Sequence, residues 1–180
     1  SSLLNAFAGF ERAIVTEVPG TTRDAIDTYI KKDGQEFCFI DTAGMRKRGK
    51  ITDNIERYST MRSLTAVDRC DVVVIMIDAV DGVTEQDTKI AGYAHNKGKA
   101  CIIAINKWDL IEKDAKTTEE YRKTVQEKFS FMLYAPILFI SALTGQRIAK
   151  LYEMIKFVAD QAALRVSTGM LNDVLNEAVA

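Results

Sequence analysis

Three short clusters in this sequence carry residue types that could bind a ligand. They are Asp41-Thr42-Ala43-Gly44, Asn106-Lys107-Trp108-Asp109 and Ser141-Ala142-Leu143. Each cluster directly follows an apolar run, at residues 37–40, 101–105 and 137–140. In an α/β sheet, ligands bind beyond the carboxyl ends of the strands. The three clusters therefore predict one shared site at that edge of the sheet.

The first cluster combines a carboxylate with a flexible backbone. We interpret residues 37–40 as a buried parallel strand that delivers Asp41 and Gly44 to the sheet edge. In a nucleotide-binding fold, the Asp41 carboxylate would lie near a magnesium ion and the Gly44 N–H near a terminal phosphate. A strand that ends in a turn is the alternative, because such short motifs also match by chance.

The second cluster has a physical interpretation as a guanine site. The Asp109 carboxylate can accept hydrogen bonds from N1–H and from the exocyclic amino group, a pair of donors that adenine lacks. An unmatched buried acceptor costs roughly 1–3 kcal/mol, and more when it is charged. Asn106 can reach N7 and tie neighbouring loops together, the Lys107 stem can lie over the base, and the Ala142 N–H can donate to O6. A polar surface turn is the alternative. Trp108 fills the free position of the motif and is expected to serve packing.

The composition describes one ordinary globular domain. The chain has 180 residues, of which 27% are charged and 47% hydrophobic, and its net charge of -1 gives no overall electrostatic case for binding nucleic acid or anionic lipid. The longest strongly apolar run, residues 72–77, is too short to span a bilayer, so we expect neither a signal peptide nor a membrane partner. Cys38, Cys70 and Cys101 are expected to be buried reduced thiols, which predicts a cytoplasmic protein.

Strands and helices alternate along the chain, which predicts an α/β fold with helices on both faces of a mostly parallel sheet. Asp33-Gly34 predicts one antiparallel hairpin within it. The expected strands are 26–32, 35–40, 71–78, 100–105 and 136–140, and a loop is expected at 11–24. The expected helices are 1–8, one from 53, 84–96, one that begins at a capping box of Thr117 and Glu120, 146–165, and 170–180.

Together with Pro-Gly-Thr-Thr-Arg-Asp at residues 19–24, the three clusters resemble the motifs of translation-factor-type P-loop GTPases. More narrowly, essentially the whole chain is similar to the second G domain of the Der (EngA) family of bacterial tandem GTPases, which are ribosome-assembly factors. The resemblance implies the three-layer P-loop GTPase fold. It also implies a G domain at residues 1–166, followed at 167–180 by a linker and the start of a KH-like domain.

The resemblance implies roles for the matching residues. Ser1 would ligate Mg²⁺ through its hydroxyl, Thr22 would close over Mg²⁺ and the γ-phosphate, and Asp41 would hold the metal through water. The implied catalytic set is Thr22, Gly44 and Met45. The implied GTP-binding set is Ser1, Ser2, Thr21, Thr22, Asp41, Thr42, Ala43, Gly44, Met45, Asn106, Lys107, Trp108, Asp109, Ser141, Ala142 and Leu143.

Two departures from the family pattern stand out. Met45 occupies the position of a water-orienting Gln, and a thioether cannot orient water. Relatives use a K⁺ ion held by a P-loop Asn and the switch I loop, here residues 16–21. The chain also opens at Ser1, where the P-loop would end. We therefore expect a truncated domain that lacks the first strand and the phosphate cradle and binds GTP poorly on its own.

The leading functional hypothesis is a GTP-hydrolysing switch domain in assembly of the large ribosomal subunit. Its implied partners are GTP or GDP, rRNA of the large subunit, a first G domain and a KH-like domain. The alternative is a non-enzymatic, guanine-nucleotide-gated module that binds RNA or protein, which Met45 favours. An ATPase is third, and Asp109 argues against it. The basic run Arg46, Lys47, Arg48 and Lys50 is either a solvated loop or a contact to rRNA or to the neighbouring domain, and His95 is expected to be structural.

Overall fold

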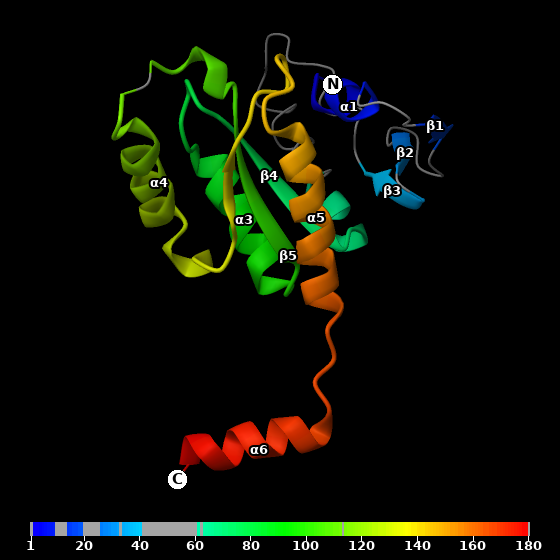
Figure 1. Ribbon diagram of the computed structural model, residues 1–180, viewed down its shortest axis with the longest axis vertical. Coiled ribbons are helices and arrows are strands. Elements are labelled where there is room, and N and C mark those ends of the chain that lie inside the picture. The colour runs from blue at the N-terminus through cyan, green and yellow to red at the C-terminus, as the bar shows by residue number, and fades with distance from the viewer. Residues whose placement is uncertain are drawn as a thin grey trace.

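The computed structural model describes residues 2–9, 14–19, 26–32, 34–40, 61, 63–112 and 114–179. A parallel sheet lies at the centre of the described part of the chain (Figure 1). It consists of β4 (Val72–Asp78), β5 (Ala100–Asn106) and β6 (Ile137–Phe139), in the order β4-β5-β6. The three strands confirm the predictions made from the apolar runs. The register pairs Asp78 with Asn106, so the polar ends of β4 and β5 lie side by side.

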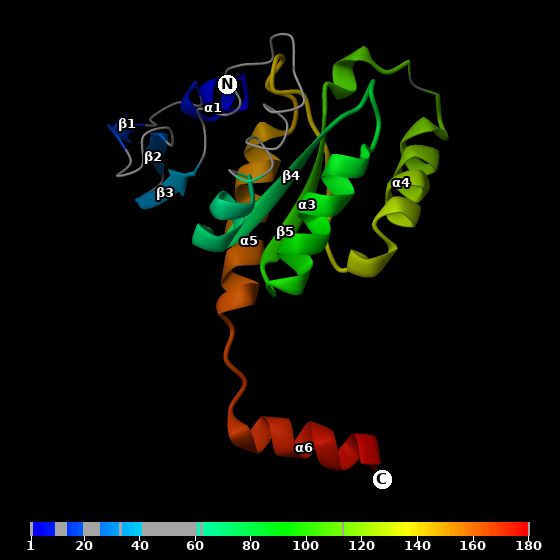
Figure 2. The same ribbon diagram turned by 180° about the vertical axis from the view of Figure 1, so that it is seen from behind.

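Helices cover both faces of the parallel sheet. α3 (Glu85–Asn96) and α4 (Thr117–Lys128) pack against one face, and α1 (Ser2–Ala8) and α5 (Ile148–Ala163) against the other. Alternate residues of β5 supply the two cores: Ile103 and Ile105 join the first, and Ile102 and Ala104 join the second. Figure 2 shows α3 in front of the sheet, and Figure 1 shows α5 in front of it. The predicted α/β arrangement of three layers is confirmed.

A second, antiparallel sheet lies beside this core (Figure 1). Its order is β1 (Ile14–Pro19), β2 (Ile26–Lys32) and β3 (Gln35–Phe39). The predicted hairpin is confirmed, with Gly34 at a φ of +76° in the turn. The loop predicted at 11–24 is wrong for residues 14–19, so the antiparallel part has three strands rather than a single pair. Pro19 fits a strand here because β1 lies at the edge of the sheet.

The prediction of a buried parallel strand at residues 37–40 is also wrong. β3 pairs antiparallel with β2 and is exposed or half-buried along its length. Phe37 packs on Tyr152 of α5 and Phe39 on Phe7 of α1, with ring centroids 4.6 and 5.1 Å apart, whereas Cys38 is exposed. Only one side of β3 therefore meets a core. An apolar run does not by itself distinguish this arrangement from a strand buried on both faces.

Two of the three thiols depart from the expected burial. Cys101 is buried as predicted, but Cys70 is half-buried and Cys38 is exposed. Burial raises the pKa of the Cys70 and Cys101 thiols, and the nearby Lys99 ammonium lowers that of Cys70 only in part. These two thiols are therefore held in their neutral form at pH 7.

The predicted start is correct for α3 and wrong for α4. Thr84 begins α3 with a capping box, because its Oγ1 accepts from Asp87 N at 3.3 Å and the Asp87 carboxylate accepts from Thr84 N at 2.9 Å. The capping box predicted at Thr117 and Glu120 is wrong. α4 has Lys116 as its N-cap, and the Asp114 carboxylate accepts from the backbone N–H groups of Lys116 and Thr117 at 2.8 and 2.7 Å.

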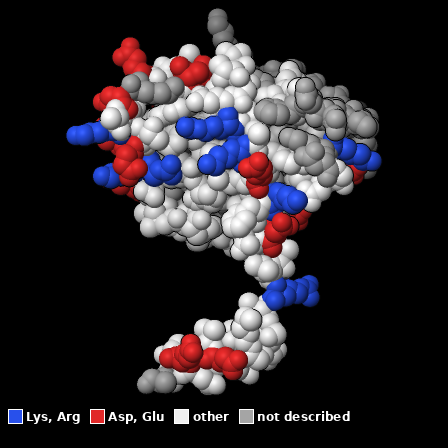
Figure 3. All heavy atoms as spheres, in the orientation of Figure 1, with Lys and Arg blue, Asp and Glu red and all other residues white. Residues whose placement is uncertain are grey.

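The last helix, α6 (Thr168–Val179), lies apart from the rest of the chain (Figures 1 and 2). It confirms the helical stretch predicted from residue 170. Its Met170, Leu171, Val174 and Leu175 side chains are exposed, and its acidic side chains gather on one side in Figure 3. None of the helices in the described part of the chain is long and apolar enough to cross a lipid bilayer.

Candidate functional site

The carboxyl ends of β4, β5 and β6 bring two of the three predicted clusters together. Ala79 N donates to Asn106 O at 2.8 Å, Ile140 N to Ile105 O at 2.8 Å, and Trp108 N to Ile140 O at 3.0 Å. These bonds continue the strand ladder into the loops that hold Asn106–Asp109 and Ser141–Leu143. The shared edge predicted from the sequence is thus confirmed for these two clusters. The third, residues 41–44, lies outside the described residues and follows β3 of the other sheet.

A hydrogen bond joins the two loops directly. Ala142 N donates to Asn106 Oδ1 at 2.9 Å, which confirms the predicted tie between neighbouring loops. The bond also fixes the orientation of the amide, because the oxygen is engaged and the Nδ2 group is the end left for another acceptor. The Ala142 N–H is the group predicted to donate to guanine O6, so a bound base would share this donor with Asn106 or take it over.

Asp109 carries an unsatisfied acceptor. It lies in the short helix η2 (Trp108–Leu110), and its Oδ1 atom is buried without a hydrogen-bond partner among the described residues. Buried polar atoms are nearly always paired, and a charged oxygen without a donor is costly. The geometry therefore leaves one carboxylate oxygen at the sheet edge that a donor from a ligand would satisfy.

Lys107 joins the ends of β5 and β4. Its backbone adopts the left-handed conformation, with φ 61° and ψ 30°, and its Nζ forms an ion pair with Asp78 Oδ2. The Asp78 side chain is 9% exposed and that of Lys107 is 49% exposed. Burial acts to raise the pKa of Asp78. The bonds from Lys107 and from the backbone N–H groups of Val80 and Asp81 outweigh it, so the pKa lies below its usual value.

Asp78 is the site residue that the sequence interpretation missed. Its position in the sequence could have revealed it, because Asp78 is an acidic residue at the end of an apolar strand, like the three clusters. In the structure it pairs with Asn106 in the register of β4 and β5.

Other predicted residues support the loops rather than the open edge. Trp108 is buried and packs on Phe139 and Tyr121, with centroids 4.4 and 5.3 Å apart, which confirms its packing role. Ser141 is fully buried, and its hydroxyl accepts from Thr144 N at 3.1 Å. Leu143 is 83% exposed.

Most of the phosphate and metal predictions lie outside the described residues and stay predictions. These residues are Ser1, Thr21, Thr22, Asp41, Thr42, Ala43, Gly44, Met45 and the basic run Arg46, Lys47, Arg48 and Lys50. Ser2 begins α1, but only its backbone is described. Within the described ranges, no group of three or more His, Cys, Asp or Glu side chains could hold a metal ion. The expected ligands Ser1, Thr22 and Asp41 all fall in the gaps.

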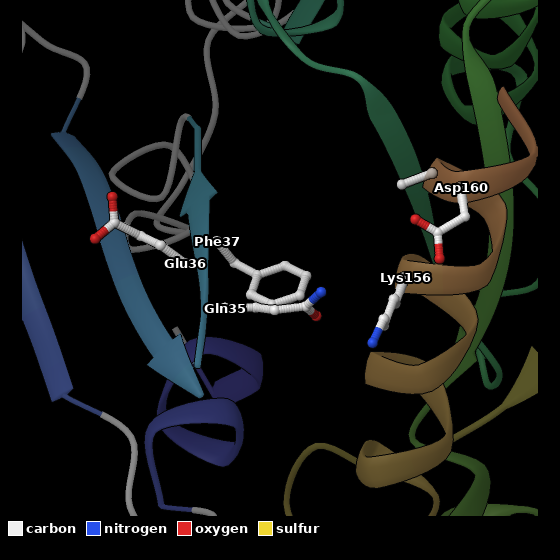
Figure 4. A pocket seen from close by; sticks show the side chains of 6 residues that line it. Gln35, Glu36, Phe37, Lys156 and Asp160 are labelled. Carbon is white, nitrogen blue, oxygen red and sulfur yellow. The ribbon is translucent and has the colours of Figure 1, made fainter. Parts of the chain in front are cut away.

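Two further features lie away from this edge. A groove of about 300 Å³ separates β3 from α5, and Phe37 points across it towards Lys156 and Asp160 (Figure 4). It is open to solvent and contains none of the predicted residues. His95 packs between Tyr134 and Phe131 and shares a 3.1 Å hydrogen bond with the Tyr134 hydroxyl, which fits its expected structural role.

Known proteins resemble this chain over its whole length. It is 71% identical to GTPase Der of Ruminiclostridium cellulolyticum and 64% identical to GTPase Der of Acetivibrio thermocellus, in each case over 100% of the chain and 41% of the relative. The chain thus spans about two fifths of the length of these curated relatives. A crystal structure of Era in complex with MgGDPNP and nucleotides 1506–1542 of 16S ribosomal RNA is similar in fold. Its TM-score is 0.63 at 27% identity, covering 86% of this chain and 51% of Era.

A family model described as "50S ribosome-binding GTPase" matches residues 1–107, which is more than half of the chain. This range ends at Lys107 and so includes β4, β5 and the first residues of the cluster that follows β5. The chain therefore belongs to the family of 50S ribosome-binding GTPases.

Proposed function

We propose that this chain is a G domain that binds guanine nucleotides and hydrolyses GTP as part of a molecular switch. The observation that carries the proposal is the buried Asp109 Oδ1, which has no hydrogen-bond partner among the described residues. It lies on the sheet edge that also holds Asn106 and Ala142. Membership of a GTPase family supports the same conclusion.

The chemistry of this edge suits guanine. The Asp109 carboxylate would accept from N1–H and from the exocyclic amino group, which restores a partner to Oδ1. Because Ala142 engages the oxygen of the Asn106 amide, the Nδ2 group would face the N7 acceptor of the base. Adenine offers no donor pair to Asp109, so an unpaired buried charge would disfavour it.

The proposal for phosphate and metal binding rests on residue types and on the family. Ser1 and Thr22 supply hydroxyl oxygens and Asp41 a carboxylate, which are hard oxygen ligands of the kind that Mg²⁺ prefers. Bound there, Mg²⁺ would offset the charge of the phosphates. Ser2, Thr21, Thr42 and Ala43 would complete the surroundings of the phosphates.

The proposed hydrolytic group consists of Thr22, Gly44 and Met45. Thr22 would close over the γ-phosphate and the Gly44 N–H would donate to it, so hydrolysis would break a contact that holds the loop. Met45 cannot orient a water molecule. A K⁺ ion near residues 16–21 is therefore proposed as an additional source of positive charge. Met45 is also the observation that favours the second candidate, a nucleotide-gated binding module without turnover.

The role of the longer protein is proposed from the relatives. The family description supports binding to the 50S ribosomal subunit. We propose that the protein acts in the cytoplasm in the assembly of this subunit and contacts its rRNA. We further propose that the G domain occupies residues 1–166, that 167–180 begins a KH-like domain, and that another G domain completes the protein. The position of α6 apart from the sheet core fits this division (Figure 2).

The substitution Asp109→Asn in the full-length protein tests base recognition. An amide at this position offers a donor where N2–H requires an acceptor, so we expect a preference for xanthine over guanine nucleotides. Competition between GDP and XDP for a fluorescent nucleotide measures this shift. Asp71→Asn is the matched control, since Asp71 is an exposed carboxylate at the opposite end of β4. Retained selectivity for GDP in Asp109→Asn would show that the base site is assigned wrongly.

Turnover separates the two candidate functions. We expect the full-length protein to hydrolyse GTP faster in potassium than in sodium at equal ionic strength. GTP binding without hydrolysis in either salt would favour the binding module.

A further inference from the structure

We infer that Asp78 is a positioning residue for the guanine base, because it holds the ammonium of Lys107 so that the lysine stem lies across the base plane. The inference deepens the proposed function and rests on it. It assigns a role to the end of β4, which none of the sequence motifs includes.

The surroundings of Asp78 hold its carboxylate in one place. Oδ1 accepts from Val80 N at 3.0 Å, and Oδ2 receives the Lys107 ammonium. The turn that follows is closed by Gly82 N, which donates to Asp78 O at 2.9 Å, and Gly82 has a φ of +75° that favours glycine. With 9% of its side chain exposed, Asp78 is a fixed acceptor rather than a mobile surface charge.

The Lys107 side chain, in contrast to Asp78, is half exposed and needs a fixed partner to hold its ammonium in place. Lysine carries its charge on a flexible four-carbon stem, so its ammonium is poorly placed unless another group holds it. The left-handed backbone at Lys107 turns the chain between Asn106 and Asp109, and the ion pair then draws the ammonium back towards β4. The stem is thereby stretched along the edge that Asn106 and Asp109 occupy.

The arrangement prepares the site before any ligand arrives. Ordering a long side chain on binding weakens affinity, and ordering it in the folded protein removes that cost. Asp78 acts on the base through Lys107, its ion-pair partner, so it contributes to affinity for the base and not to the choice between guanine and xanthine.

A double-mutant cycle in the full-length protein tests the inference. The variants are Asp78→Asn, Lys107→Met and the pair together, and the measured quantity is the Kd for GDP. We expect each single variant to weaken GDP binding by about tenfold, from the ordering cost of one long side chain. We expect the double variant to be no weaker than Lys107→Met alone. The ratio of XDP to GDP affinity should stay that of the parent in all three.

Two further variants separate positioning from charge and from folding. Asp78→Glu keeps the charge but moves the carboxylate by one methylene, so it should weaken GDP binding as Asp78→Asn does. Glu85→Gln is the control for loss of an ion-paired carboxylate away from the site, because Glu85 pairs with Lys89 on the exposed face of α3. It should bind GDP as the parent does. Circular dichroism confirms that each variant is folded.

Two outcomes would overturn the inference. One is that Asp78→Asn and Asp78→Glu bind GDP with a Kd within twofold of the parent. The other is that the Kd of the double variant rises by the product of the two single increases. Asp109→Asn keeps this result distinct from a failure of the proposed function. If Asp109→Asn shifts to xanthine while Asp78→Asn binds GDP normally, only the role of Asp78 is refuted.

Discussion

The parallel and antiparallel sheets differ in how they are supported. β5 is buried along residues 101–105 between two hydrophobic cores, whereas β3 is exposed or half-buried and meets helices on one side only. The residues proposed to recognise the base extend from the first sheet. β1, β2 and β3 flank the segments proposed to sense the phosphates. The comparison suggests that base recognition is built on the rigid sheet and phosphate sensing beside the less supported one.

The sharpest test of this comparison removes a side chain from each sheet. Ile105→Ala leaves a cavity near the carboxyl end of β5, where the side chain is fully buried, and should lower the free energy of unfolding by about 2–5 kcal/mol. Cys38→Ala on exposed β3 should change it by no more than about 0.5 kcal/mol. Urea denaturation measures both. Equal losses would mean that the two sheets are supported alike.

An ion pair links the antiparallel sheet to the segment that precedes β4. Arg69 donates to Asp27 Oδ2 of β2 at 2.5 Å, while the other Asp27 oxygen is buried without a partner among the described residues. Arg69→Ala would leave this carboxylate without its partner. Because the Arg69 side chain is 44% exposed and partly screened, we expect a loss of about 1–3 kcal/mol in unfolding free energy rather than the full cost of a buried pair.

Two variants check the explanation for Arg69. Asp27→Asn in the Arg69→Ala background should recover part of the lost stability, since a neutral amide is cheaper to bury than an unpaired charge. Lys31→Ala removes the exposed partner of Glu36 in the same sheet and should be nearly neutral. Similar losses for Lys31→Ala and Arg69→Ala in thermal unfolding would contradict a specific anchor.

Surface positions of the well-supported half should matter less than its core. Thr84→Ala removes the capping box of α3 and should lower the unfolding free energy by about 1 kcal/mol. Glu120→Ala should have little effect, because the capping box expected there from the sequence does not form. Chemical denaturation of the two variants measures the difference. A larger loss of unfolding free energy for Glu120→Ala than for Thr84→Ala would indicate that α4 does have the predicted capping box.

The smallest expected effect concerns the sheet edge itself. The pKa of Asp78 is lower in the folded protein than in the unfolded chain, so its stabilisation is present above the unfolded pKa of about 4 and lost as pH falls through the folded value. At pH 7, Asp78→Asn should cost about 0.5 kcal/mol, since the Lys107 side chain is half exposed. At acidic pH, the unfolding free energies of Asp78→Asn and the parent should become equal. A difference that is independent of pH would show that the ion pair contributes nothing to folding.

The sequence predicted those parts of the fold in which local pattern and burial agree. β4 and β5 were predictable because a run of apolar residues ends in a polar one, and the hairpin of β2 and β3 because of its glycine turn. β1 was missed because Pro19 and two polar residues, Thr16 and Glu17, hide an edge strand whose pairing is supplied by β2. Pairing across a sheet is a tertiary effect that a local pattern does not contain.

The same distinction holds for the candidate site. The shared edge of Asn106, Asp109 and Ala142 was predictable because each residue closely follows an apolar run. The ion pair of Lys107 with Asp78 was not, because it depends on the register between two strands whose sequences are separate. The start of α4 was predicted wrongly for the same kind of reason. Asp114, which lies outside α4, accepts from the Thr117 N–H that Glu120 would take in a capping box, and Glu120 N donates to Lys116 O instead.

The hydrogen bonds that join the strand ends also bear on how often this edge of the sheet opens. The amides of Trp108, Ile140 and Ala142 all donate to acceptors on or beside β5 and β6. Such amides exchange with deuterium only when the sheet opens, so they should belong to the slowest-exchanging part of the chain. An edge that opened so rarely would not set the pace of nucleotide release by its own fluctuations. The residence time of the nucleotide would then be controlled from the phosphate end.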